Sequence, residues 1–416
     1  QMCIRDRSLG LLLIISILSL ISCKKEIPKM LEKGTYRGVL EVKDQQELPF
    51  IFEVKNDTLI TIFNAEEKII VDEITYKNDS VKIQTPVFEG YIIAKVDKNK
   101  LKGSFIKPSL DRIVPFEAIK SKERFASTKD TSVNISGNWE TIFSQDSEVD
   151  RYIAKGIFKQ IGKKVTGTFR TTTGDYRYLE GIMNGDSLKL STFDGAHAFL
   201  FTAKATDSTL NGFFYSGNHW KESFTAKLNN DYKLPKEEEL TFIKKGYEYF
   251  DFSFPDTRGR VVSLSDPEFQ NKVIIIQIMG TWCPNCLDES KYLVKYLKEN
   301  PNKDLQIIAL AFEVAKTREI AYNRINRLKN RIGIKYPVLL AQYGNVANKT
   351  LAQQKLPMLN HIISYPTTIF MDKNKKVRKI YTGFNGPATG EKYEEFKEEF
   401  EVFVNTLLTA VSYTHL

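Results

Sequence analysis

The two halves of the chain have different patterns of hydrophobic and polar residues. From about residue 34 to 230, short stretches alternate between apolar and polar positions, as in LPFIFEV at 48–54 and SVKIQT at 80–85. Asn, Asp and Gly separate these stretches, which is typical of antiparallel strands joined by hairpins. Long stretches of helical periodicity are missing there. The pattern predicts an all-β region over residues 30–230.

This β-rich region also repeats itself. The repeated segments are NDSVKIQT at 78–85 with GDSLKLST at 185–192, and YIIAKVDKNKLKGSF at 91–105 with FLFTAKATDSTLNGFF at 199–214. We therefore expect two copies of a β-meander unit, at about 34–125 and 135–230. They could form two small barrels or sandwiches side by side, or two halves of one larger sheet.

The β-rich region offers few candidate chemical groups. It contains no cysteine, and its imidazoles are His197 and His219. His219 stands beside Trp220 and could line a pocket, but both histidines are more simply read as ordinary strand residues. The best hypothesis for this region is a platform for binding or docking.

The pattern changes after a linker at 231–248. Continuous apolar runs at 272–279 and 305–312 indicate buried parallel strands, and each is followed by a helical pattern. Further strands are expected at 367–372 and 378–383, before a final amphipathic helix. Alternating β and α elements predict an α/β domain over 249–410 with helices on both faces of its sheet. The stretch 337–363 is interpreted as an insertion, which could shape the substrate groove or pack as a helix.

Composition narrows the class of protein. The chain has 416 residues, of which 42% are hydrophobic and 27% charged, and its mean hydropathy is −0.31. These values are those of a globular protein and exclude a membrane protein with many spanning helices. The net charge of +9 is spread along the chain, so we expect no nucleic-acid partner. One segment, 316–335, carries seven basic residues and one acidic residue. It is interpreted as a solvated helix face, with anionic lipid or an acidic partner as alternatives.

The beginning of the chain predicts export. Residues 9–21 form an apolar run of about 13 residues, shorter than the roughly 20 that a membrane-spanning helix needs. This run fits the core of a signal peptide over residues 1–22. Ser22-Cys23 directly after it resembles a bacterial lipobox, which implies a lipid anchor on Cys23 and a place in the cell envelope. Residues 1–7 and 411–416 resemble sequencing-adapter read-through, so we expect them not to belong to the fold.

The central chemical motif is Cys283-Pro284-Asn285-Cys286, between the first apolar strand and the first helix of the second half. Haem attachment would need His at position 287, which is Leu287, and structural zinc would need two more ligands. A redox dithiol fits better. The free N–H groups at a helix start stabilise a thiolate on Cys283, and one helical turn brings Cys286 within reach of a disulfide.

With its flanking segments, this half resembles the thioredoxin-like fold of the TlpA/ResA type of envelope thiol–disulfide oxidoreductases. The segments that carry the resemblance are FSFPDTRGRVVSLSD, GTWCPNCLDE, SYPTTIFMD and KIYTGFNGPATG. The resemblance implies that Cys283 attacks, that Cys286 resolves, and that Pro366 is a cis-proline facing the dithiol. It implies that Glu313 accepts a proton from Cys286. The residues that it places against substrate are Trp282, Pro284, Tyr365 and Thr367.

The resemblance also implies partners. One group of partners is envelope proteins that contain disulfides, and the other partner is a membrane electron donor. The redox group would be the Cys283–Cys286 disulfide, with no metal and no bound cofactor. Gln277 departs from the family, because thioredoxin itself has a buried aspartate there. Two other functions stay open. One is a lipid-anchored binding protein with an auxiliary redox domain, and the other is a thiol peroxidase.

Overall fold

The structure is a computed structural model that describes residues 28–410, except 132, 236–239, 248 and 345–348. The predicted signal segment, the predicted lipidation site Cys23 and the predicted terminal artefacts lie outside the described residues. In the described part of the chain, no helix is long and apolar enough to cross a membrane.

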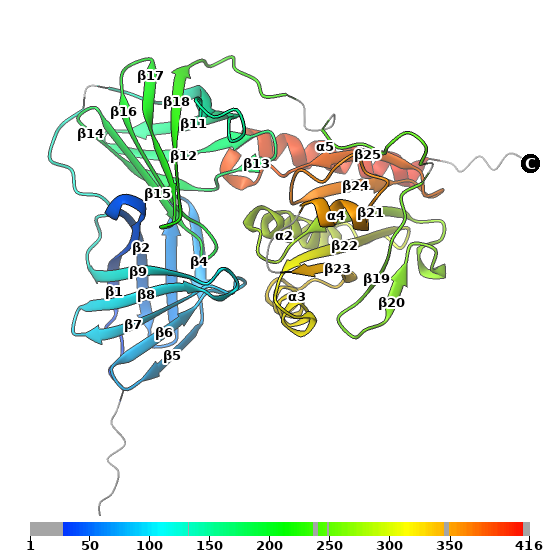
Figure 1. Cartoon of the computed structure of the whole chain (residues 1–416), viewed down its shortest axis with the longest axis horizontal. Coiled ribbons are helices and arrows are strands. Elements are labelled where there is room, and N and C mark those ends of the chain that lie inside the picture. The colour runs from blue at the N-terminus through cyan, green and yellow to red at the C-terminus, as the bar shows by residue number, and fades with distance from the viewer. Residues whose placement is uncertain (1–27, 132, 236–239, 248, 345–348, 411–416) are drawn as a thin grey trace, which may run out of the picture.

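The first repeat unit forms an antiparallel sheet of nine strands (Figure 1). The strands are β1 (Gly34–Val42), β2 (Gln46–Asn56), β3 (Leu59–Asn64), β4 (Glu67–Val71), β5 (Glu73–Lys77), β6 (Ser80–Gln84), β7 (Tyr91–Asp97), β8 (Lys100–Lys107) and β9 (Arg112–Lys120). Their order is β4-β3-β2-β1-β9-β8-β7-β6-β5, so the first and last strands pair. Alternate residues are buried, as Ile92, Ala94 and Val96 show on β7. The alternating sequence pattern thus becomes a sheet with one apolar face.

The second unit also forms a nine-stranded sheet. Its strands are β10 (Gly137–Phe143), β11 (Tyr152–Ile161), β12 (Lys164–Thr171), β13 (Gly174–Asp175), β14 (Leu179–Asn184), β15 (Ser187–Phe193), β16 (Ala198–Ala205), β17 (Thr209–Ser216) and β18 (Trp220–Leu228). Strand β11 pairs with both β10 and β12, and this closes the sheet into a barrel. The region is therefore all-β, with two barrel-like sheets.

Equivalent positions in the two sheets explain why the sequence repeats. Gly103 on β8 and Gly212 on β17 occupy matching places. At each, a Cβ atom would overlap the backbone of the adjacent strand, at Ile93 or Thr202. Only glycine allows this close approach. Tyr36 and Trp139 also match, and both are completely buried.

The two sheets pack against each other. Phe193 of β15 inserts into the core of the first sheet, with its ring centroid 4.5 Å from that of Phe50 and 5.0 Å from that of Phe105. The Asn64 side chain donates a hydrogen bond to the Phe193 carbonyl at 2.9 Å. The β-rich half is thus joined by a shared apolar core.

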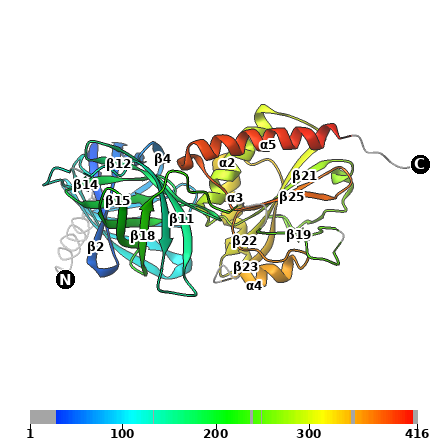
Figure 2. The same cartoon turned by 90° about the horizontal axis from the view of Figure 1, so that it is seen from above.

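The second half contains a five-stranded sheet in the order β23-β22-β21-β24-β25. Its strands are β21 (Val273–Met279), β22 (Leu305–Val314), β23 (Val338–Gly344), β24 (Thr367–Met371) and β25 (Val377–Thr382), after a short hairpin of β19 (Ser253–Pro255) and β20 (Val261–Ser263). Its helices are α2 (Pro284–Glu299), α3 (Arg318–Ile332), α4 (Lys349–Lys355) and α5 (Glu391–Thr409). Figure 2 shows α2 and α5 on one side of the sheet and α4 on the other. This is the expected α/β arrangement.

Two sequence-based interpretations need correction here. The stretch 337–363 is not only a groove or helix, because it contains the edge strand β23, parallel to β22. Its apolar run, VLLA, is short and gave no clear periodicity. The basic segment is not simply solvated either. Arg324, Arg327 and Arg331 of α3 pair with Glu89, Glu73 and Asp72 of the β-rich half.

Candidate active site

The dithiol lies where β21 leads into α2. Cys283 has an extended backbone and caps the helix, and its Sγ accepts a hydrogen bond from the Cys286 N–H at 3.2 Å. Pro284 fits the first helical position because it has no N–H to leave unpaired. Cys283 is 7% exposed and Cys286 is completely buried. Burial, together with the Cys283 sulfur, raises the pKa of Cys286 well above its ordinary value. The two thiols therefore differ in access to the surface.

The loop before β24 faces Cys283. The Tyr365–Pro366 peptide bond is cis, as the sequence predicted, and the Cys283 thiol donates to the Tyr365 carbonyl at 3.3 Å. Thr367 does not fit the predicted contact with substrate. Its side chain is completely buried, and its hydroxyl donates to the Ser364 carbonyl at 2.9 Å. Thr367 instead stabilises the turn that presents Tyr365.

Trp282, which precedes Cys283 in the chain, packs against the same loop. Its indole N–H donates to the Phe312 carbonyl at 2.9 Å, and its ring packs edge-on against Tyr365 at 5.5 Å between centroids. Trp282, Pro284 and Tyr365 all line the cavity in front of Cys283, and their contact with substrate stays a prediction.

Glu313 lies at the end of β22 and holds the loop that precedes the dithiol. Its carboxylate accepts from the Thr281 N–H at 2.9 Å and from the Thr281 hydroxyl at 2.5 Å. Burial raises the pKa of Glu313, although the bonds from Thr281 oppose this shift. The hydrogen bonds that Glu313 accepts thus come from Thr281, and its predicted role toward Cys286 stays a prediction.

A different acid, Glu289, lies beside Cys286. It is buried one helical turn further along α2, and its carboxylate accepts from Gln277 Nε2 at 2.7 Å and from the Thr368 hydroxyl at 2.5 Å. Burial raises the pKa of Glu289 to about 7, and its charge in turn raises the pKa of Cys286. Sequence reasoning missed Glu289. The signal was its spacing, since residues three apart on a helix share a face.

The β-rich half supplies a second wall for the site. The segment around β13 crosses in front of the dithiol, where Ser364 Oγ donates to the Thr173 carbonyl at 2.9 Å and Asn285 Nδ2 donates to the Asp175 carbonyl at 3.2 Å. A Cβ atom on Gly174 would overlap the Asn285 amide. Between the walls lies a cavity of about 560 Å³. It is lined by Tyr152, Thr171, Thr172, Thr173, Gly174, Asp175, Tyr176, His197 and Phe199 on one side, and by Trp282, Cys283, Pro284, Asn285, Ile363, Ser364 and Tyr365 on the other.

One buried arginine fastens this wall. Arg177 donates to the Pro284 carbonyl at 3.3 Å and pairs with Asp288 of α2 and with Glu67 of β4. Its Nε lies 3.1 Å from Asp194. Several carboxylates thus converge on one guanidinium at the start of α2.

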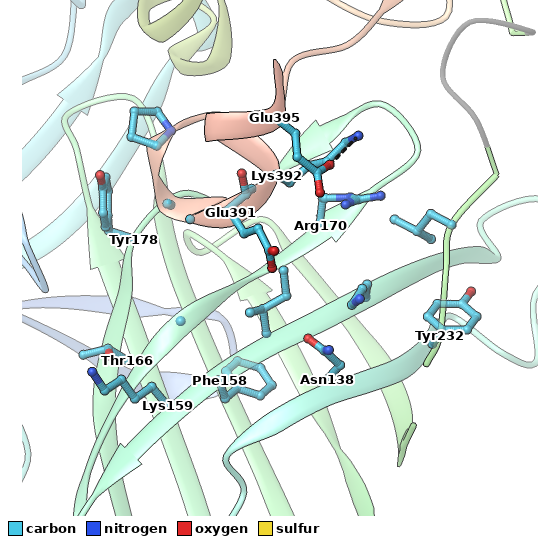
Figure 3. Close-up of a pocket in the computed structure, with 18 of the residues that line it drawn as sticks. Asn138, Phe158, Lys159, Thr166, Arg170, Tyr178, Tyr232, Glu391, Lys392 and Glu395 are labelled. Carbon is cyan, nitrogen blue, oxygen red and sulfur yellow. Dashed lines mark hydrogen bonds and ion pairs between the residues drawn. The ribbon is translucent and has the colours of Figure 1, made fainter. Parts of the chain in front are cut away.

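A separate cavity of about 660 Å³ lies between the second barrel and the start of α5 (Figure 3). Side chains of both charges line it, including Lys159, Glu391 and the ion pair of Lys392 with Glu395. Neither cysteine of the dithiol borders it. In the described part of the chain, no group of three or more His, Cys, Asp or Glu side chains is arranged to hold a metal ion. The cavity in front of Cys283 is therefore the candidate active site.

The known proteins that this chain resembles match its second half. Residues 246–380 match the AhpC/TSA family. The chain is 28% identical over 145 residues to the thiol-disulfide oxidoreductase ResA of Geobacillus thermodenitrificans, an alignment that covers 35% of this chain and 73% of that protein. It is 26% identical over 141 residues to the thioredoxin-like protein YneN of Bacillus subtilis, with 34% and 73% covered. A solved structure of a thiol:disulfide interchange protein of the thioredoxin family from Chlorobium tepidum aligns with a TM-score of 0.29 and 18% identity, and covers 40% of this chain and 98% of that one. Residues 246–380 of the second half thus match the model of the AhpC/TSA family, and the second half is similar to ResA-type thiol-disulfide oxidoreductases, which confirms the resemblance predicted from the sequence.

Proposed function

We propose that this protein is a thiol–disulfide oxidoreductase of the cell envelope that reduces protein disulfides through Cys283 and Cys286. The observation that carries the proposal is the arrangement of the two thiols. Cys283 caps α2 at the edge of a cavity, whereas Cys286 is completely buried behind it. An accessible attacking sulfur and a protected resolving sulfur are what disulfide exchange requires.

The reaction proceeds in two exchanges. The Cys283 thiolate attacks one sulfur of the substrate disulfide, whose S–S bond breaks, and a mixed disulfide forms. Cys286 then attacks the Cys283 sulfur and releases the second substrate thiol. Two electrons pass from the dithiol to the substrate, and Cys283 and Cys286 end as a disulfide. Before the attack, the Cys286 N–H and the Tyr365 carbonyl hold the Cys283 sulfur in place.

Cys286 must lose its proton before it can resolve the mixed disulfide. We assign this proton to Glu289, because its charge acts on Cys286 from one helical turn further along α2 and its pKa of about 7 suits a proton acceptor at neutral pH. Glu313 positions Thr281 and the loop before Cys283. A Glu289→Gln variant should form mixed disulfides at the normal rate and resolve them about 10²-fold more slowly.

The proposal includes the location and the partners. The apolar segment 9–21 and Cys23 support export and lipid attachment on the envelope side of a membrane. A membrane electron donor would reduce the Cys283–Cys286 disulfide after each turnover. Metabolic labelling with a fatty-acid analogue tests the anchor, since a Cys23→Ser variant should lose the label.

The decisive experiment compares two variants. A Cys286→Ala variant should accumulate mixed disulfides with envelope proteins through Cys283, and Cys283→Ala should accumulate none. The wild type should reduce insulin disulfides. No trapped partner together with no insulin reduction would contradict the proposal and leave the lipid-anchored binding protein. Rapid peroxide consumption without a disulfide substrate would favour the thiol peroxidase. The reduction potential of the Cys283–Cys286 pair would separate a reductant from an oxidant.

A further inference from the structure

We propose that His197 of the β-rich half is a catalytic acid of the redox site, which protonates the leaving thiol of a cysteine-derived, dialkyl disulfide held between His197 and Cys283. This inference rests on the proposed disulfide exchange. It gives the β-rich half a chemical task in addition to that of a wall.

The placement of His197 is the first support. His197 lies at the start of β16, far from the dithiol in sequence, yet it borders the same cavity as Cys283. Its side chain is 29% exposed. Among the residues lining this cavity, it carries the imidazole, the side-chain group that general acid–base catalysis uses most often.

The orientation of the ring is the second support. His197 Nδ1 is buried and lies 3.4 Å from Asp194 Oδ2 without hydrogen-bond geometry, and the ring stacks on Phe199 at 4.3 Å between centroids. The accessible edge of the ring therefore carries Nε2. Asp194 Oδ1 also accepts the backbone N–H groups of Ala196 at 2.9 Å and His197 at 2.6 Å, so the carboxylate is fixed with respect to the ring.

The charge on Asp194 is the third support. Burial alone would raise its pKa, but His197 and Arg177 hold the pKa of Asp194 well below its ordinary value. Asp194 is thus an anion that lies 3.4 Å from the imidazole. A buried carboxylate behind a histidine that faces a reacting group is a recurrent arrangement in acid–base catalysis.

In the chemical step, the substrate S–S bond is exchanged for a mixed disulfide with Cys283. The Cys283 thiolate forms a bond to the nearer substrate sulfur as the substrate S–S bond breaks. The electron pair of that bond leaves on the distant sulfur. His197 Nε2–H transfers its proton to that sulfur, which departs as a thiol, and water re-protonates the imidazole before the next turnover. A cysteine-type thiolate has a pKa of about 8.5 and benefits from this proton, whereas an acidic aromatic thiolate leaves without it.

Leaving-group dependence tests the proposal. The fully reduced protein is mixed with bis(2-hydroxyethyl) disulfide, a dialkyl disulfide, or with 5,5′-dithiobis(2-nitrobenzoate), whose leaving thiol is acidic. His197→Gln should slow the first reaction by at least about tenfold and change the second by less than about twofold. His219→Gln removes a histidine that does not line the cavity, and should change neither rate.

The aromatic disulfide also reports how much of each variant is folded and active. Equal slowing of both substrates in His197→Gln would mean a structural role and overturn the proposal, as would no slowing of either. If the wild type reduces neither disulfide, the proposed function fails instead.

Discussion

The β-rich half meets the thioredoxin-like domain in two places that use charge differently. At the start of α2, the completely buried Arg177 binds Asp288, Glu67 and Asp194. We call this the Arg177 contact. Along α3, Arg327 and Arg331 reach across to acidic side chains that are 39–50% exposed, and Arg324 pairs with the less exposed Glu89. We call this the α3 contact.

The difference teaches which contact holds the active site together. Removing one partner from a buried ion pair leaves an uncompensated charge in a medium that solvates it poorly, whereas water replaces a lost partner at the surface. The Arg177 contact also touches the dithiol loop directly, through the Pro284 carbonyl. We therefore expect disruption of the Arg177 contact to affect both stability and chemistry, and disruption of the α3 contact to affect neither strongly.

The largest effect is expected from Arg177→Met. Three buried carboxylates would lose their shared cation, which should lower the free energy of unfolding by about 3–5 kcal/mol. Urea unfolding followed by circular dichroism measures this loss. Arg258→Met is the control, because the Arg258 side chain is 81% exposed and its pair with Asp256 is superficial. Equal unfolding midpoints for the two variants would remove the distinction between the contacts.

A pH effect should come next, from Asp175 at the edge of the Arg177 contact. Burial raises the pKa of Asp175 to about 6 from 3.8. Because the folded-state value is raised, the contribution of Asp175 to stability is complete below pH 4 and is lost as the pH rises through 6. Between pH 4 and 7 the wild type should lose about 2 kcal/mol relative to Asp175→Asn. Thermal unfolding of both proteins across this range checks the sign, and a constant difference would refute it.

A smaller effect is expected where backbone meets backbone. Gly383 has a φ of +81°, and a Cβ atom there would overlap the Thr173 carbonyl of the cavity wall. Gly383→Ala should cost about 2 kcal/mol through backbone strain and should displace this wall. Iodoacetamide should then alkylate Cys283 faster than in the wild type. Gly259→Ala, at another positive φ but with open space around it, should leave the alkylation rate unchanged.

The smallest effect belongs to the α3 contact. Arg331 pairs with Asp72 and Glu73, and its side chain is 25% exposed. Arg331→Ala should lower stability by no more than about 1 kcal/mol, and most of this loss should vanish in 1 M salt. Urea unfolding at low and high salt measures both. A loss as large as that of Arg177→Met would show that the two contacts are equivalent.

Much of the fold could be predicted from local patterns in the sequence. The strands of the β-rich half, the repeat and the α/β order of the second half were predictable, because alternation and helical periodicity reflect which face of each element is buried. Strand β23 was missed since its short apolar run has no distinctive period. The dithiol and the cis-proline loop were predictable because both lie within short, characteristic segments.

The arrangement around the dithiol was not predictable in the same way. Glu289 had a signal in its spacing from Cys286, but only its burial against Gln277 and Thr368 shows that it is an acid of raised pKa. His197 was read as an ordinary strand residue, and the arginines of α3 as a solvated face. Neither interpretation could take account of a neighbour more than 80 residues away in the chain, which is Cys283 for His197 and the acidic residues of the β-rich half for the arginines of α3.

The sequence by itself therefore determined the secondary structure, the two kinds of sheet and the dithiol, since these depend on residues close together in the chain. Only the tertiary structure decided that the second barrel forms a wall of the candidate active site, that Arg177 fastens it and that His197 borders the same cavity as Cys283. The physical reason is that burial and electrostatic pairing depend on how the two halves pack, and no local pattern records that packing.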